Sequence, residues 1–153
     1  MMTRWHLLHL PVRVADEARA WRRVQEVLFS WPEARVQGLV LDHWWPRVLY
    51  LPVGEGVRID PMGIYVSHRG LAMPRSRRWF QREALKTGQW LGRLVRDTTG
   101  RELGRVKDIV IDETSLRITG LVISRGLLRD LLDGAWLARW SSLTWDGDGR
   151  MKW

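Results

Sequence analysis

Apolar residues recur with a short period along most of this chain, and this pattern predicts strands more often than helices. In the second half, the pattern predicts strands at residues 91–95, 102–112, 117–124 and 135–140. Asp97-Thr98-Thr99-Gly100 and Asp112-Glu113-Thr114-Ser115 have the residue types of turns. Gly120 lies inside a predicted strand, where a glycine indicates a bulge or a tight bend.

The clearest feature of the second half has a counterpart in the first. Residues 24–41 can be laid on residues 106–123 without a gap, at a constant offset of 82 residues. A chain that repeats itself at half its length indicates duplication of one small domain. On this reading the first half predicts strands at 5–14, 48–53 and 62–66, a turn without glycine at 15–19, and a relation between Arg47 and Arg129 at the same offset.

Many short strands with little helix favour small barrels or sandwiches, and closure of a barrel protects strand edges. We therefore predict a mostly β fold with a first domain over residues 4–72, a basic connector over 73–89, and a second domain over 90–153. The second half of the connector is rich in helix formers, so a short helix is expected there. Domains this small are marginally stable alone, and we expect the halves to pack together or the protein to dimerise.

The turn and strand residues resemble a known family. Gly92-Arg93, residues 97–112 and residues 118–124 are similar to the PRC-barrel family, most clearly over 91–153 and more weakly over 5–67. The resemblance implies two small antiparallel barrels in tandem. It also implies a non-catalytic protein that docks on other macromolecules, without catalytic or cofactor residues. The first half departs from the pattern, since Arg19-Ala20-Trp21-Arg22-Arg23 stands where the second half has Gly100 and Gly104.

Composition narrows the location and the chemistry. The chain has no cysteine, which excludes disulfides, thiolate catalysis and Cys-based metal sites. No apolar run approaches the roughly 18 residues of a membrane-spanning helix, so the sequence predicts a cytoplasmic protein without membrane insertion. Of the net charge of +8, residues 73–90 alone contribute +4, with five basic residues and one acidic residue.

Two groups are candidate binding residues. The connector combines arginines with aromatic rings, a mixture that binds single-stranded nucleic acid: Arg75, Arg77, Arg78 and Arg82 with Trp79 and Phe80. The alternative, which we favour, is a solvated linker whose aromatic side chains pack onto a barrel. Trp44-Trp45 is the second group, because neighbouring strand residues point to opposite faces and one ring could meet a partner.

The sequence places no catalytic, cofactor or metal constellation. On the predicted opening strand, His6 and His9 would lie on opposite faces and would not share a metal. An enzyme would need a pocket that holds His43 or His68 beside a carboxylate. Asp146-Gly147-Asp148-Gly149 reads as a hairpin turn rather than a calcium loop, since the chain ends before the twelfth position.

These observations predict a non-enzymatic adaptor or assembly module that binds another macromolecule, with a protein as the expected partner. The alternative is an RNA-binding or ribosome-associated factor that uses the basic connector. Self-association as a homodimer is a further expectation, and no cofactor is expected.

Overall fold

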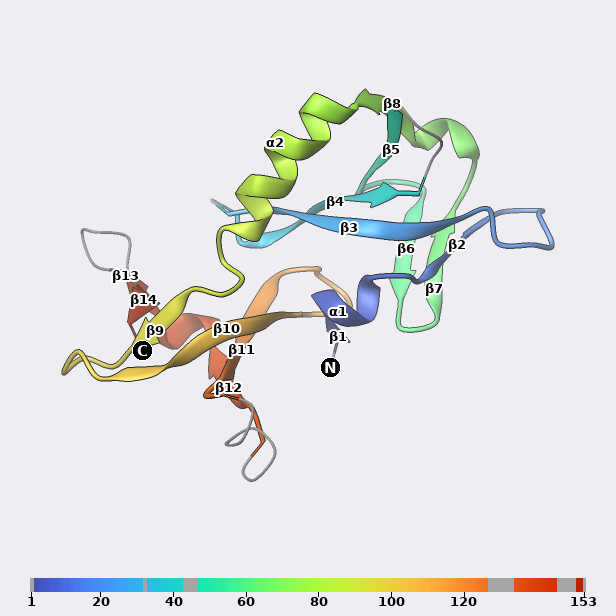
Figure 1. Ribbon diagram of the computed structural model, residues 1–153. Coiled ribbons are helices and arrows are strands. Elements are labelled where there is room, and N and C mark those ends of the chain that lie inside the picture. Colours follow the sequence, from blue (N-terminus) through green and yellow to red (C-terminus); the bar gives the residue numbers. More distant parts are fainter. Residues whose placement is uncertain (1, 32, 43–46, 127–133, 146–150, 153) are drawn as a thin grey trace.

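The computed structural model describes residues 2–31, 33–42, 47–126, 134–145 and 151–152. In this part of the chain the fold is mostly β, with the strands arranged in two curled seven-stranded sheets (Figure 1). The helices are α1 (Arg4–Leu7), α2 (Arg77–Gly88) and two short 3-10 turns, η1 (Arg69–Leu71) and η2 (Trp140–Ser142). No helix among these residues is long and apolar enough to cross a membrane.

The first sheet is built from the first half of the chain, in the order β6-β7-β2-β3-β4-β5-β8. Its strands are β2 (Pro11–Val14), β3 (Arg22–Ser30), β4 (Arg35–Leu41), β5 (Arg47–Pro52), β6 (Val57–Asp60), β7 (Gly63–Val66) and β8 (Met73–Ser76). The late strand β7 pairs in parallel with the early strand β2, and the other pairs are antiparallel. This pairing curls the sheet back towards its own beginning.

The second sheet follows a similar order, β12-β11-β10-β9-β14-β13, and β1 from the chain's start pairs with β10. Its strands are β1 (Met2–Thr3), β9 (Leu94–Arg96), β10 (Glu102–Ile111), β11 (Ile118–Ser124), β12 (Trp136–Arg139), β13 (Thr144–Trp145) and β14 (Met151–Lys152). Here too the late strand β14 runs parallel to the early strand β9. Each sheet therefore contains one parallel pair that the prediction of purely antiparallel strands did not include.

The long hairpins of the two sheets have the same register. Val24 pairs with Leu41 in β3 and β4, and Val106 pairs with Ile123 in β10 and β11, both 82 residues later. The register shifts also coincide, and the second shift skips Thr119, next to Gly120, as expected of a glycine-marked bulge.

Beyond the hairpins the offset changes. Leu41 pairs with Leu49 and Ile123 pairs with Trp136, so β5 and β12 are related by 87 residues. The predicted relation between Arg47 and Arg129 at 82 residues is therefore wrong, and Arg129 lies outside the described residues. The longer connection between β11 and β12 accounts for the difference.

The start of the chain also differs from the prediction. Thr3 caps α1, with its Oγ1 accepting from the His6 N–H at 3.2 Å, so only residues 11–14 of the predicted opening strand form a strand. His6 therefore lies on a helix, with its Nε2 3.0 Å from the Pro61 oxygen, and the opposite-face argument for His6 and His9 does not apply. Strand β6 was not predicted, because Val57-Arg58-Ile59-Asp60 is too short to show a clear alternation.

The two halves share one hydrophobic core. Its fully buried side chains come from both sheets, for example Val27 and Leu39 from the first and Ile109 and Leu121 from the second. Two reciprocal hydrogen bonds join the hairpin turns, from the Val36 N–H to the Leu116 oxygen at 2.9 Å and from the Ile118 N–H to the Ala34 oxygen at 2.8 Å. Because these residues are equivalent in the two halves, the contact has an approximate two-fold symmetry.

Tryptophans fill the seam between the halves. The ring of Trp31, at the end of the first hairpin, lies 4.3 Å from that of Trp90 and 6.2 Å from that of Trp140. Trp90 precedes β9 and Trp140 begins η2, so three distant segments meet here. This arrangement agrees with the expectation that most tryptophans serve packing.

Candidate functional site

Helix α2 is formed from the basic connector, whose first residues instead form β8 and extend the first sheet. Ser76 is the N-cap, and its Oγ accepts from the Trp79 N–H at 3.1 Å. The helix continues through good helix formers to Gly88. Near its end, the buried Thr87 accepts from the Phe29 N–H at 3.2 Å, which fastens α2 to β3.

The aromatic side chains of α2 pack on the outer face of the first sheet. Trp79 and Phe80 cover a small cluster of buried residues that is separate from the main core: Leu28, Val40, Val48 and Tyr50. The Trp79 ring lies 4.9 Å from the Tyr50 ring, and the Arg75 guanidinium lies 5.5 Å from the Trp79 ring centre. The packing of these rings agrees with the favoured alternative for the connector.

The arginines around α2 form a basic hollow of about 720 Å³. Its lining residues come from β5, β8 and α2: Arg47, Pro74, Arg75, Ser76, Arg77, Trp79 and Arg82. Four guanidinium groups at one concave surface favour an anionic ligand. Arg82 also lies near a carboxylate, with its Nε 3.8 Å from the Glu83 Oε1.

The electrostatics of Tyr50 reflect its position beneath this helix. Burial raises the pKa of the Tyr50 hydroxyl, and the Glu83 carboxylate raises it further, while Arg75 acts in the opposite direction. Its hydroxyl donates to the Gln37 oxygen at 3.4 Å. Tyr50 is therefore a neutral packing residue and does not supply a charge to the hollow.

The structure brings together only part of the predicted set. Arg75, Arg77, Trp79 and Arg82 line the basic hollow, whereas Arg78 is exposed on α2 and is not among the lining residues. Trp44 and Trp45 lie outside the described residues, as do His43 and Asp146-Gly147-Asp148-Gly149. Arg47 was missed, because only the pairing of β5 with β8 places it beside the connector.

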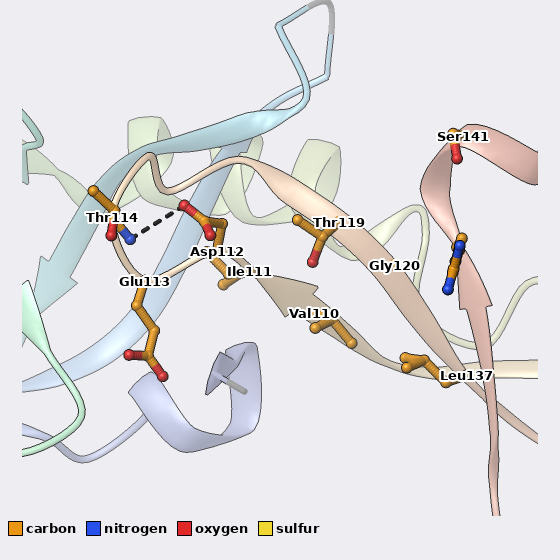
Figure 2. Close-up of a pocket in the computed structure, with 10 residues that line it drawn as sticks. Val110, Ile111, Asp112, Glu113, Thr114, Thr119, Gly120, Leu137 and Ser141 are labelled. Atoms are coloured by element: carbon orange, nitrogen blue, oxygen red, sulfur yellow. Dashed lines mark hydrogen bonds between the residues drawn. The ribbon is translucent and has the colours of Figure 1, made fainter.

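A second hollow, of about 580 Å³, lies on the outer face of the second sheet. We call this surface the open face and define it by Val110, Gly120, Val122, Ala135 and Leu137. The hollow itself is lined by Val110, Ile111, Asp112, Glu113, Thr114, Thr119, Gly120, Leu137, Arg139 and Ser141 (Figure 2). Leu137 is 53% exposed, which makes it one of the most exposed large apolar side chains among the described residues.

One rim of this hollow is the turn between β10 and β11. The Asp112 carboxylate accepts from the Ser115 N–H and Oγ, both at 2.7 Å, and from the Thr114 N–H at 3.2 Å. The Ser115 hydrogen bonds and that of Thr114 lower the pKa of the Asp112 carboxyl. The rim is thus a rigid, negatively charged turn, in which Figure 2 shows Glu113 next to Asp112.

Neither hollow has the residues of a catalytic or metal site. The lining residues of both contain no histidine, and His68 is exposed at the N-terminus of η1. Among the described residues, no three His, Asp or Glu side chains are grouped so as to hold a metal ion. What these surfaces offer is binding: an anion in the basic hollow and an apolar segment on the open face.

Comparison with known proteins bears on the second half of the chain. Residues 85–136 match the family model of the PRC-barrel domain. The match runs from the last turn of α2 through β9, β10 and β11 to the start of β12. No curated protein matches the chain. Through its second half, the chain belongs to the PRC-barrel domain family.

Proposed function

We propose that this protein is a non-catalytic adaptor or assembly module, built from two PRC-type barrels in tandem, that binds another protein through the open face. The family supports a non-catalytic module, and the shared hairpin register of the two sheets supports the tandem arrangement. The observation that carries the binding role is the exposed Leu137 above an apolar hollow, next to the buried Val110. Exposed apolar surface rimmed by polar groups is typical of protein–protein contacts.

Site-specific photo-cross-linking in source cells tests this proposal. A photoreactive residue at position 137 should give one dominant adduct of defined mass, because the partner covers this side chain. The control is position 62, where Met62 is 77% exposed on the opposite half of the chain. The proposal is overturned if position 137 gives no adduct, or gives the same adducts as position 62.

The basic hollow supports a second candidate, binding of single-stranded RNA. Arg47, Arg75, Arg77 and Arg82 line one surface together with part of the Trp79 ring. Phosphate contacts would give affinity without sequence choice, and stacking on Trp79 is limited because its ring already contacts Tyr50 and Arg75. We therefore rank this candidate below protein binding.

An RNA titration at several salt concentrations tests the second candidate. If the hollow binds RNA, replacing Arg75, Arg77 and Arg82 by Ala should weaken binding to an oligouridylate and reduce the salt slope by about 0.7 for each phosphate that is no longer neutralised. A control of equal charge change replaces the exposed Arg13, Arg19 and Arg78, which do not line the hollow. An equal weakening in both triple variants would show non-specific attraction only.

A further inference from the structure

The two sheets differ in what lies on their outer faces. In the first half, β8 adds to the edge of β5, with Tyr50 opposite Met73 and Arg47 opposite Ser76. The chain then turns into α2, which covers Leu28, Val40, Val48 and Tyr50. Residues 73–88 therefore act as one strand–helix segment that covers both an edge and a face.

The open face consists of the equivalent positions in the second half. From the hairpin register and the pairing of β12 with β11, Val110, Val122, Ala135 and Leu137 correspond to Leu28, Val40, Val48 and Tyr50. Tyr50 is 6% exposed, whereas Leu137 is 53% exposed. The sheet order ends at β12, so no strand among the described residues occupies the edge that β8 occupies in the first half.

The charge at the hairpin end of the open face indicates what can bind there. In the first half the Trp31 Nε1 donates to the Lys86 oxygen at 3.0 Å, so the last turn of α2 lies against the hairpin end. The residues equivalent to Ser30 and Trp31 are Asp112 and Glu113, two carboxylates that share the lining of the hollow with the cation Arg139. A helix end carries partial negative charge, so a helix docked here needs a basic residue in its last turn.

We propose that the edge of β12 and the open face bind a strand–helix segment of a partner protein, of the same kind as residues 73–88. Extended residues of the partner add to β12, and an amphipathic helix follows across Val110 and Leu137. Its first turn carries an aromatic side chain over Leu137, and its last turn carries a basic residue beside Glu113. This inference rests on the proposed protein-binding function and specifies its ligand.

The chain itself supplies the probe. A synthetic peptide with the sequence of residues 72–90 should bind the full-length protein saturably. Amide shifts in its nuclear magnetic resonance spectrum should change along β12 and the outer face of β10 and β11. Leu137→Asp should weaken this binding at least tenfold, because it places a charge under the aromatic side chain. The control Met62→Asp should leave it unchanged, since Met62 lies far along the chain on the β6–β7 turn.

Two peptide variants test the details. A peptide with Trp79→Ala should bind at least tenfold more weakly, and one with Lys86→Glu at least threefold more weakly, because of the carboxylates at the hairpin end. The inference is overturned if the peptide does not bind, or if the shift changes appear around Tyr50, where the peptide would be displacing α2. It is also overturned if sedimentation shows a dimer of the full chain that Leu137→Asp dissociates, because the occupant would then be a second copy.

These outcomes are separate from those of the cross-linking experiment. If position 137 gives a specific adduct but the peptide fails to bind, the protein-binding function stands and the strand–helix ligand is wrong. If position 137 gives no adduct, the proposed function itself is wrong.

Discussion

The two halves of the molecule have the same hairpin register and use different means to stabilise it. In the second half, glycines occupy backbone positions that a side chain would strain, such as Gly92 at φ +78° and Gly104 at φ +149°. In the first half, His9 has φ +71° at the place of Gly92, and Arg22 pairs with Val12 as Gly104 pairs with Val95. The first half also has α2 packed on its outer face.

This difference indicates where each half has room to change. A sheet covered by its own helix gains buried apolar area that offsets a poorer turn. A sheet without that cover depends more on the turn chemistry, and its outer face stays accessible. Four predictions test this comparison of the halves.

The largest effect is expected at Gly104. A Cβ at this position would meet the backbone oxygen of Ser124 and the Ile123 Cγ2, and the positive φ disfavours any side chain. Gly104→Ala should lower the free energy of unfolding by about 4 kcal/mol, from backbone strain together with overpacking. Urea denaturation measures this change.

The matched control is Arg22→Ala, at the equivalent position of the first half. Arg22 is only partly buried and already carries a side chain, so its replacement should cost no more than about 1 kcal/mol. Similar destabilisation in the two variants would show that the first strands of the two halves are not equivalent.

The next effect compares the two outer faces. Tyr50→Ala should cost about 3 kcal/mol, because it removes a buried ring that contacts Trp79 and covers Gly38. Leu137→Ala, at the equivalent position, should change stability by no more than about 0.5 kcal/mol, because the side chain is half exposed. A large destabilisation by Leu137→Ala in the isolated protein would mean that the open face is already covered.

A smaller effect, with opposite signs in the two halves, is expected at the turn before the first long strand. His9→Gly should stabilise the protein by about 1 kcal/mol, since glycine adopts this φ without a steric cost. Gly92→Ala should destabilise it by about the same amount, although a Cβ there would meet no atom within 4 Å. Thermal unfolding of the two variants measures both changes, and shifts of the same sign would contradict the structural equivalence of these residues.

The sequence predicted those elements whose signals are local. The hairpin of residues 102–124 has alternating apolar residues, a polar turn and a bulge marked by Gly120, and α2 has a serine cap followed by helix formers. The start of the chain misled the prediction, because the apolar residues of 5–10 read as a strand while Thr3 caps a helix. In that case a single hydrogen-bonding side chain outweighed a weak hydrophobic pattern.

The candidate surfaces depended on contacts that sequence reasoning did not reach. Arg75, Arg77, Trp79 and Arg82 were found because they are neighbours along the chain. Arg47 joins them through pairing of β5 with β8, and Leu137 becomes a candidate only when its equivalence with Tyr50 is known. Both facts depend on long-range strand pairing and on a change of the offset from 82 to 87 residues, which no local pattern encodes.

The smallest effect concerns the pH dependence of the two hairpin turns. The pKa of the Asp112 carboxyl is lowered by hydrogen bonds from Ser115 and Thr114, whereas the equivalent residue in the first half is the uncharged Ser30. A folded-state pKa below the unfolded value of about 3.9 means that this stabilisation is complete well above pH 4 and is lost as the pH falls through the folded pKa. Asp112→Asn should therefore flatten the fall in the free energy of unfolding between about pH 5 and pH 2. Ser30→Asn, at the matched position, should leave that slope as it is, and urea denaturation across this pH range distinguishes the two. Equal slopes for Asp112→Asn and the wild-type protein would show that the second hairpin turn is not held by its carboxylate.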